Sequence, residues 1–256
     1  MHPAEYDRMF ALEDGHWWYR AVRELVEWHV RRAAAGKAVR ILDAGCGTGA
    51  LAAVLQKYGS VSALDASAQA VAYCRQRGVT AVACVDLRAW DAPECAYDII
   101  VCVDVLYHAG IGDDAAVVKK FCRALAPKGM LVVHLPAFEC LRRGHDIVVA
   151  TKRRYTRRQA RSLLAENGFE VRECCYRMPW LFLAALVSKW RESRHAPRGE
   201  ERSDLQQVTP LLNAILLAVA RFENIFVRRG VGMPFGSSIC LVATKANVLE
   251  PPCLKA

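Results

Sequence analysis

The chain has 256 residues, of which 54% are hydrophobic and 24% are charged, so it can bury a sizeable core and is not a disordered protein. Residues 1–13 contain no continuous apolar run, which predicts no signal peptide and a cytoplasmic protein. The 11 cysteines are odd in number and lie mostly in apolar runs, which favours reduced core thiols over disulfides. No cysteines and histidines have the spacing of a zinc site, and we expect no metal.

The first expected element is an amphipathic helix. Apolar side chains recur at helical spacing between Ala21 and Val30, so one face of this helix should pack on the domain. The aromatic stretch His16-Trp17-Trp18-Tyr19 stands directly before it. We interpret this stretch as part of a lid over a ligand site. The alternative is that Trp17 and Trp18 only pin the helix to the sheet.

A parallel sheet wrapped by helices is expected from Val39 onward, because short β-branched runs alternate there with helical patterns. A last pair of strands, without a good helix directly between them, should be antiparallel. The expected strands are 39–43, 61–65, 80–85, 98–103, 130–135, 169–175 and 238–245. The chain then divides into lid helices at 1–36, a core at 37–176 and 237–246, and an insertion at 177–236.

The insertion holds two apolar segments, "MPWLFLAALVS" and "VTPLLNAILLAVARF", separated by the polar residues 189–207. Both segments are shorter than the ~20 residues that a membrane-spanning helix needs. We therefore expect a helical cap and no transmembrane helix, with a membrane-surface hairpin as the alternative. The polar stretch is expected to be a mobile loop.

The stretch "ILDAGCGTGA" (41–50) places a glycine loop between a strand and a helix. Glycines let the backbone turn tightly and approach a ligand closely. The spacing also fits a dinucleotide site, in which Asp65 would bind a ribose. Asp43 at the strand tip argues against this, because its carboxylate would repel a pyrophosphate, whereas it favours the sulfonium and ammonium of S-adenosylmethionine. Asp86 would accept a hydrogen bond from adenine. The alternative is that Asp43 and Asp86 only cap helices.

Five motifs between Arg40 and Ala137, namely "ILDAGCGTG", "LDAS", "CVDL", "YDIIVCVDVLYH" and "RALAPKGMLVVHLPA", resemble the class I S-adenosylmethionine-dependent methyltransferases. The resemblance is strongest to the bacterial small-molecule branch related to quinone-biosynthesis methyltransferases. It implies a Rossmann-like α/β fold, with a seven-stranded, mostly parallel sheet in the order 3-2-1-4-5-7-6 and helices on both faces. It also implies S-adenosyl-L-methionine as the cofactor.

The resemblance further implies which residues hold that cofactor. The glycine loop would surround its methionine part, Asp65 would bind both ribose hydroxyls, and Asp86 with Leu87 would bind adenine. Leu64 and Ala66 would pack beside the adenosine, and the end of the fourth strand would face the amino group. The implied set is Asp43, Gly45, Cys46, Gly47, Gly49, Leu64, Asp65, Ala66, Asp86, Leu87, Cys102, Val103 and Asp104.

A bacterial subgroup of these enzymes is similar in having His-Trp-Trp before the glycine loop, and His-Asp and Arg-Arg-Tyr-Thr elements after the fifth strand. Tyr107 stands where relatives usually have glutamate, so the substrate pocket should differ from theirs. We expect substrate contacts from Trp17, Trp18, Tyr107, Asp146, Arg153, Arg154 and Tyr155. Arg153 and Arg154 have two interpretations. They bind an anionic group of the acceptor, or they belong to a solvated helix face near an N-cap at Thr156.

The expected function is methyl transfer to a small, partly apolar acceptor, chiefly at oxygen. His108, His145 and then His16 are the candidate bases, because imidazole titrates near neutral pH, whereas His134 is interpreted as a satisfied core residue. A net charge of +9, concentrated between Arg142 and Arg161, keeps RNA or protein methylation as an alternative, although a nucleic-acid platform would interleave basic and aromatic residues. A peripheral membrane or partner-binding protein is a third hypothesis, and monomer and homodimer stay open.

Overall fold

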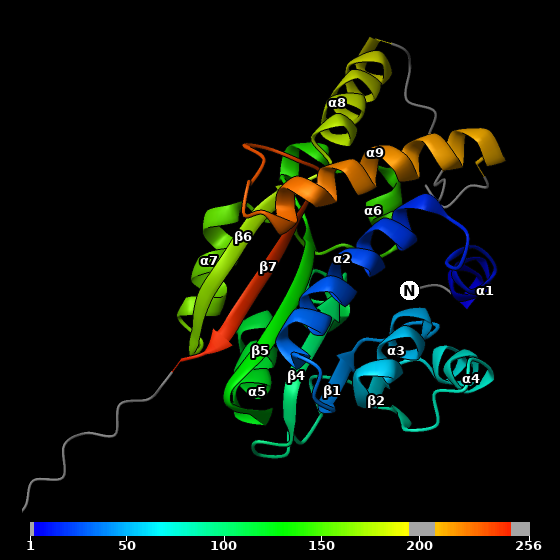
Figure 1. Ribbon diagram of the computed structural model, residues 1–256. Coiled ribbons are helices and arrows are strands. Elements are labelled where there is room, and N and C mark those ends of the chain that lie inside the picture. Colours follow the sequence, from blue (N-terminus) through cyan, green and yellow to red (C-terminus); the bar gives the residue numbers. More distant parts are fainter. Residues whose placement is uncertain (1–2, 195–207, 247–256) are drawn as a thin grey trace, which may run out of the picture.

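The computed structural model describes residues 3–194 and 208–246 and contains one seven-stranded sheet covered by helices on both faces (Figure 1). The strand order is β3-β2-β1-β4-β5-β7-β6. Strands β1 to β5 are parallel to one another, while β7 lies antiparallel between β5 and β6. The expected fold class and strand order are therefore confirmed.

The strands lie close to their expected positions, and their bounds are β1 Val39–Ala44, β2 Gly59–Asp65, β3 Val82–Cys84, β4 Tyr97–Val103, β5 Leu125–Pro136, β6 Phe169–Arg177 and β7 Ser238–Lys245. β3 is shorter than expected and β5 longer. Consecutive residues alternate between the two faces of a strand, and in the central strands both faces are buried, as is usual for parallel sheets. Ile41 and Leu42, for example, pack into different core clusters.

The helices form two layers. One face of the sheet is covered by α5 (Asp114–Ala124) and α7 (Arg157–Ala165), and the other by α2 (Trp17–Ala34), α3 (Ala50–Leu55), α4 (Ala68–Gln76) and α9 (Pro210–Arg228). The remaining helices are α1 (Pro3–Leu12), α6 (Gly144–Val148) and α8 (Pro179–Arg194), with short 3-10 turns at 56–58, 109–111 and 139–141.

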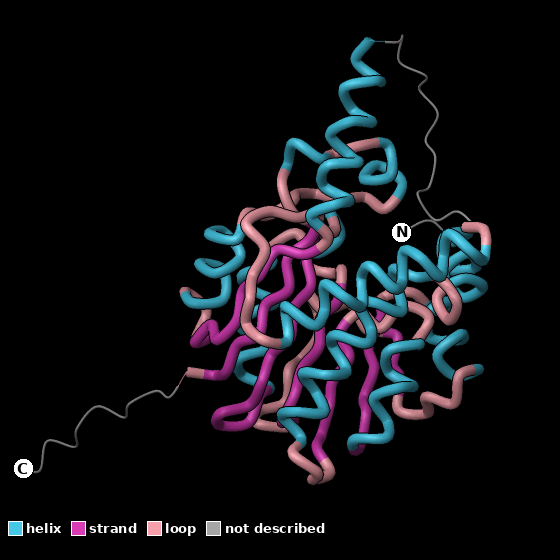
Figure 2. Tube along the Cα trace, turned by 45° about the horizontal axis from the view of Figure 1, so that its top comes forward, coloured by secondary structure: helices cyan, strands magenta, loops and turns pink. Residues whose placement is uncertain are grey.

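The insertion forms α8 and α9, which are longer than the apolar segments of the sequence suggest. Helix α9 packs lengthwise along α2, whereas α8 projects from the carboxyl ends of the strands (Figures 1 and 2). The polar stretch was expected to be a loop, but residues 189–194 continue α8. The rest of it, residues 195–207, lies outside the described residues.

Two local expectations can be checked directly. Thr156 is the N-cap of α7, where its hydroxyl accepts from the Gln159 N–H and the Gln159 side chain accepts from the Thr156 N–H. Leu163 and Leu164 of the same helix are buried. The cysteines were expected to be core residues, but Cys84, Cys95 and Cys140 are exposed, so the expectation holds only for part of the set.

Candidate functional site

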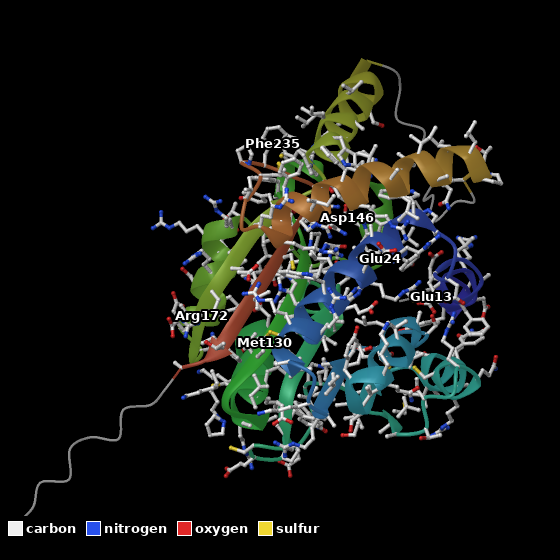
Figure 3. All side chains as sticks on the ribbon, in the orientation of Figure 1. Glu13, Glu24, Met130, Asp146, Arg172 and Phe235 are labelled. Carbon is white, nitrogen blue, oxygen red and sulfur yellow. The ribbon has the colours of Figure 1, made fainter. Side chains whose placement is uncertain are left out.

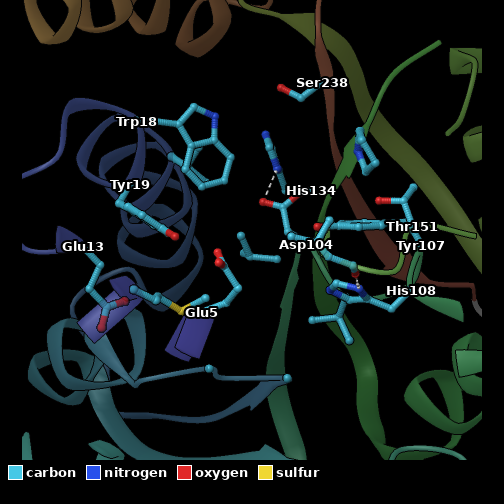
Figure 4. Close-up of a pocket in the computed structure, with 18 of the residues that line it drawn as sticks. Glu5, Glu13, Trp18, Tyr19, Asp104, Tyr107, His108, His134, Thr151 and Ser238 are labelled. Atoms are coloured by element: carbon cyan, nitrogen blue, oxygen red, sulfur yellow. Dashed lines mark hydrogen bonds and ion pairs between the residues drawn. The ribbon is translucent and has the colours of Figure 1, made fainter. Parts of the chain in front are cut away.

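A cavity of about 1000 Å³ lies at the carboxyl ends of β1, β2, β4 and β5. This is the edge at which open α/β sheets bind ligands. Helices α1 and α2 form one wall, and residues of α8 contribute to another. In Figure 4, Trp18 and Tyr19 of α2 face Asp104 and His134 across the cavity. The charged lining residues are Glu5, Glu13, Arg23, Asp43, Asp65, Asp86, Arg88, Asp104, Arg143, Asp146 and Arg154.

The glycine loop lines the bottom of this cavity. Gly45 has a φ of +80°, and a Cβ there would stand 2.3 Å from Cγ2 of Val105, so both the backbone conformation and the space require glycine. The N–H of Gly47 donates to Oδ2 of Asp65 over 2.9 Å. The loop is thus held by the acid at the tip of the neighbouring strand.

Asp43 is a buried carboxylate next to the loop. Its side chain is 2% exposed, and Oδ2 has no hydrogen-bond partner among the described residues. Burial, with smaller contributions from Asp65 and Glu13, raises the pKa of Asp43 to about 7. The ionised form of such a buried carboxyl is stabilised by a neighbouring cation and destabilised by a second anion.

This part of the cavity therefore fits a cationic ligand. Besides Asp43, the carboxylates of Glu13, Asp65 and Asp104 line the same space. A sulfonium or ammonium group would offset the charge of these acids, whereas a pyrophosphate would be repelled at several positions. This set of acidic side chains fits S-adenosylmethionine and does not fit a dinucleotide.

Asp65 already holds the first helix against the loop. Its Oδ1 accepts from the Tyr6 hydroxyl over 3.3 Å and from the Ser67 N–H over 2.9 Å, and burial raises its pKa. Met9 lies over Gly47, whose Cβ would be 3.1 Å from the Met9 sulfur. Neither Tyr6 nor Met9 was predicted from the sequence to be a site residue.

Further contacts fix α1 across the cleft. Phe10 stacks on Tyr73 of α4 at 4.2 Å between ring centroids, and the Tyr73 hydroxyl donates to Asp7 over 2.5 Å. Arg77 pairs with Asp14 at 2.8 Å and Glu13 at 2.9 Å. The available signal was the spacing of Tyr6, Met9, Phe10 and Glu13, which puts them on one face of a helix.

The aromatic stretch expected to form a lid does line the cavity. His16 caps α2 by accepting from the Trp18 N–H through Nδ1 over 3.3 Å, and burial lowers its pKa. Trp17 packs on Trp180 at 5.2 Å between ring centroids. Its backbone N–H donates to Asn213 of α9 over 2.8 Å. Trp17 and Trp18 thus both line the cavity, and Trp17 also contacts α8 and α9 beside it.

At the far end of the cavity Asp86 and Leu87 also line the wall. The Asp86 carboxylate forms an ion pair with Arg88 at 2.6 Å, and this hydrogen bonding lowers its pKa. The contact of Asp86 with adenine stays a prediction, and it has to be made beside Arg88.

Tyr107 and His108 follow β4 and line the cavity, with their rings 4.3 Å apart. Nδ1 of His108 lies 2.6 Å from the Val149 carbonyl oxygen, which can only accept, so Nδ1 carries the proton. Burial lowers the pKa of His108, and it raises that of Tyr107.

Asp104 and His134 form a pair at the tips of β4 and β5. Nδ1 of His134 lies 2.9 Å from Oδ2 of Asp104, and both residues line the cavity (Figure 4). One oxygen of Asp104 is thus engaged by His134, and the expected contact with the cofactor's amino group falls to the other. From the sequence His134 was interpreted as a satisfied core residue, and its pairing with Asp104 was not predicted.

Asp146 and Arg154 line the cavity but bind each other, at 2.9 and 3.1 Å. Burial alone would raise the pKa of Asp146, but the bonds from Arg154 and the Arg143 N–H outweigh it and hold the pKa low. Figure 3 places Asp146 at the carboxyl-end edge, away from Met130 and Arg172. The side chain of His145 lies outside the described residues.

Arg153 and Tyr155 are not brought to the cavity. Arg153 pairs with Asp114 and lies over the Tyr155 ring, while the buried Tyr155 hydroxyl donates to Asp114 over 2.6 Å. Both residues therefore fix the start of α5. Among the residues expected to bind the cofactor, Gly49, Leu64 and Cys102 are also outside the lining, whereas Gly45, Cys46, Gly47, Ala66, Leu87 and Val103 are part of it.

Comparisons with known proteins agree with this geometry. A family model described as a methyltransferase domain matches residues 41–129, which run from β1 into β5 and include the glycine loop. These residues are similar to the methyltransferase domain of the class I S-adenosylmethionine-dependent enzymes. S-adenosylmethionine is the cofactor of this class of enzyme, and the acid-lined part of the cavity fits it.

The chain is 30% identical over 142 residues to a ubiquinone biosynthesis O-methyltransferase of Bordetella avium, and the match covers 49% of this chain and 57% of that protein. A protein of the same name from Xanthomonas oryzae is 30% identical over 99 residues, 36% of this chain and 41% of its own. The chain thus spans about half the length of the curated relatives it matches.

Two solved structures have the same fold at low sequence identity. One is a methyltransferase from Thermotoga maritima, with a TM-score of 0.59 and 17% identity over 94% of this chain and 95% of that one. The other is the [4+2]-cyclase SpnF, with a TM-score of 0.56 and 19% identity over 91% and 86%. Since one is named a methyltransferase and the other a cyclase, the shared fold does not define the reaction.

Proposed function

We propose that the protein transfers the methyl group of S-adenosylmethionine to an oxygen of a small, partly apolar acceptor. The observation that carries this proposal is the division of one cavity into two chemical parts. Acids surround the glycine loop, whereas the side under α8 is lined by apolar residues, among them Trp18, Leu141, Leu181 and Ala185. A volume of about 1000 Å³ is at the upper end for ligand pockets and leaves room for an acceptor beside the cofactor.

The cofactor supplies an activated methyl group when bound. The chain's own residues then have to align the acceptor, exclude water and, for a hydroxyl, receive its proton. The indoles of Trp17 and Trp18 are suited to excluding water from the cation. The assignment of oxygen as the methylated atom is supported by the curated relatives, which are named O-methyltransferases.

Calorimetry with S-adenosylmethionine, S-adenosylhomocysteine and NAD tests the cofactor part. We expect binding of the first two, and binding of NAD alone would refute the proposal. Transfer of labelled methyl to catechol, 3,4-dihydroxybenzoate and a long-chain alkylphenol tests the acceptor part. Product is expected with at least one of these phenols. Methylation of amine analogues in place of all of them would contradict the assignment to oxygen.

The basic segment gives little support to an RNA substrate. Arg142, Arg153 and Arg154 are paired with Glu139, Asp114 and Asp146, respectively, so these three cations are already used within the protein. Binding to tRNA with a steep salt dependence would reverse this assessment.

We also propose that the outer faces of α8 and α9 contact a lipid surface. Helix α9 is the one helix of the described ranges that is long and apolar enough to cross a membrane, yet it is docked on α2. Glu223, its only acid, is buried, and accepts from the Met178 N–H over 2.8 Å. The exposed apolar residues are Leu183, Leu186 and Val187 on α8 and Leu211, Leu212, Ile215, Val219, Phe222 and Ile225 on α9.

Charge and position favour anionic lipid as the partner. No exposed acid lies between 179 and 189 or between 210 and 231, whereas Lys189 and Arg229 are exposed cations. The other face of α8, with Leu181, Ala185 and Ser188, lines the cavity. An apolar acceptor would thus enter beside the lipid contact.

Vesicle flotation tests this contact. The protein should float with phosphatidylcholine vesicles that contain phosphatidylglycerol. The pair Ile215→Gln and Phe222→Gln should abolish flotation, while Arg158→Gln on α7, across the sheet, should not. Absence of flotation with a concentration-dependent dimer would instead assign the surface to a second copy.

A further inference from the structure

Asp104 and His134 are placed side by side by the sheet itself. Val103 is in register with His134 on the adjacent parallel strand, and the Asp104 N–H donates to the His134 carbonyl oxygen over 3.1 Å. The carboxylate then turns back to Nδ1 of the same histidine. Asp104 adopts a φ of +56° to do so, a backbone conformation that is unfavourable for a residue with a side chain and is concentrated at functional sites.

The other ring nitrogen of His134 has no hydrogen-bond partner in the described part of the chain. An ionised carboxylate only accepts hydrogen bonds, so Nδ1 of His134 donates and Nε2 presents a lone pair. Nε2 is buried and forms no hydrogen bond with any described residue. Figure 4 shows this nitrogen pointing away from Asp104, toward the space between Trp18 and Ser238.

A second polar atom in the same part of the cavity is also without a partner. Ser238, at the start of β7, lines the cavity, and its Oγ is buried and unbonded among the described residues. It reaches this place because β7 pairs with β5, with Ser238 opposite Pro136. Buried polar atoms are nearly always satisfied, so two such atoms beside an apolar wall indicate a place for a hydroxyl-bearing ligand.

We propose that His134, held by Asp104, is the base that takes the proton of the acceptor hydroxyl, with Ser238 as a hydrogen-bond partner of the same acceptor. This inference rests on the proposed function and deepens it. The acceptor oxygen forms a bond to the transferred methyl carbon as the carbon–sulfur bond breaks. The electron pair of the O–H bond stays on oxygen and the proton passes to Nε2. The resulting imidazolium is stabilised by the Asp104 carboxylate and loses its proton to water.

His108 is the competing base, and the geometry disfavours it. Its Nδ1 donates to the uncharged Val149 carbonyl, and burial lowers its pKa. A carboxylate stabilises an imidazolium far better than a carbonyl does. Of the two histidines that the structure places in the cavity next to β4, only His134 therefore has a partner suited to holding the proton.

The first experiment needs no acceptor. Imidazole ¹⁵N signals of the whole protein report which nitrogen carries the proton, and the signal of His134 is assigned by its loss in His134→Asn. At pH 7.5 we expect Nδ1 protonated and Nε2 unprotonated, with the Asp104→Asn variant losing this preference. A proton on Nε2 in the wild-type protein overturns the proposal.

The second experiment separates a catalytic from a structural role. In His134→Asn the amide N–H replaces Nδ1–H toward Asp104, so the variant should fold and bind S-adenosylhomocysteine within about threefold of wild type. Methylation of catechol should fall by about 10²- to 10⁴-fold, the usual contribution of a general base. His108→Asn tests the competing base, and a larger loss of activity in this variant than in His134→Asn would overturn the proposal.

An acceptor with a more acidic hydroxyl gives the decisive comparison. 4-Nitrocatechol ionises near neutral pH and needs no base, so at pH 8 the loss caused by His134→Asn should be much smaller with it than with catechol. Equal losses with both phenols would show a structural role. If the wild-type protein binds the cofactor but methylates none of the phenols named in either subsection, the proposed function fails, while the ¹⁵N measurement still decides the state of His134.

Discussion

Asp43 gives the sharpest test of how the cofactor is held. Its pKa is raised to about 7, chiefly by burial, so in the free protein its charge is lost as the pH falls below 7. A bound sulfonium or ammonium requires the ionised form. The apparent dissociation constant for S-adenosylmethionine should therefore rise about tenfold from pH 8 to pH 6, which corresponds to about 1.4 kcal/mol.

Calorimetry at pH 6, 7 and 8 measures this dependence, with Asp43→Asn as the control. The variant should bind the cofactor more weakly at pH 8 and should lose the pH dependence. A wild-type dissociation constant that does not change between pH 6 and pH 8, or the same change in the variant, would refute the electrostatic reasoning.

The same substitution should stabilise the protein without its cofactor. The pKa of Asp43 is higher in the folded state than in the unfolded chain, so ionisation opposes folding. This cost is complete above pH 7 and decreases as the pH falls toward the ordinary aspartate value. Asp43→Asn should raise the free energy of unfolding at pH 8, with an upper bound of about 4 kcal/mol, and should raise it less at pH 5. A loss of stability at pH 8 would contradict this.

Three other substitutions test neighbouring parts of the structure. Asp65→Ala removes the acceptor for the Gly47 N–H and for the predicted ribose hydroxyls. Calorimetry should show S-adenosylhomocysteine binding weakened by about tenfold or more, because bonds to a charged acceptor are worth roughly 1.5 to 3 kcal/mol. Unchanged affinity would count against the assignment. Replacing Trp17 and Trp18 together by Ala should lower cofactor affinity in the folded fraction, whereas a pure packing role predicts lost thermal stability alone. Thr156→Ala removes one half of a capping box and should cost about 1 kcal/mol in denaturant unfolding, with cofactor binding unchanged; an equal loss of binding would mean that α7 is coupled to the site.

The two large departures from expectation have a common cause. α1 contributes Tyr6 and Met9 to the cavity, and His134 pairs with Asp104. Neither Tyr6 nor His134 stands out in the local sequence, because a tyrosine in a short helix and a histidine inside a buried strand are usually packing residues. What they do depends on partners 59 and 30 positions away in the chain.

Local sequence patterns were sufficient to predict the sheet, the glycine loop and the strand-tip acids Asp43, Asp65 and Asp104. These features follow from local periodicity and from residues near one another in the chain, and parallel strands bring their carboxyl ends to one edge. Which acids are paired with arginines, and which acid keeps an oxygen without a partner among the described residues, could be learned only from the folded chain. Asp86 and Asp146 are matched by arginines, whereas an oxygen of Asp43 is not. The difference arises because burial and long-range pairing set the charge of a carboxylate, and the order of residues along the chain does not.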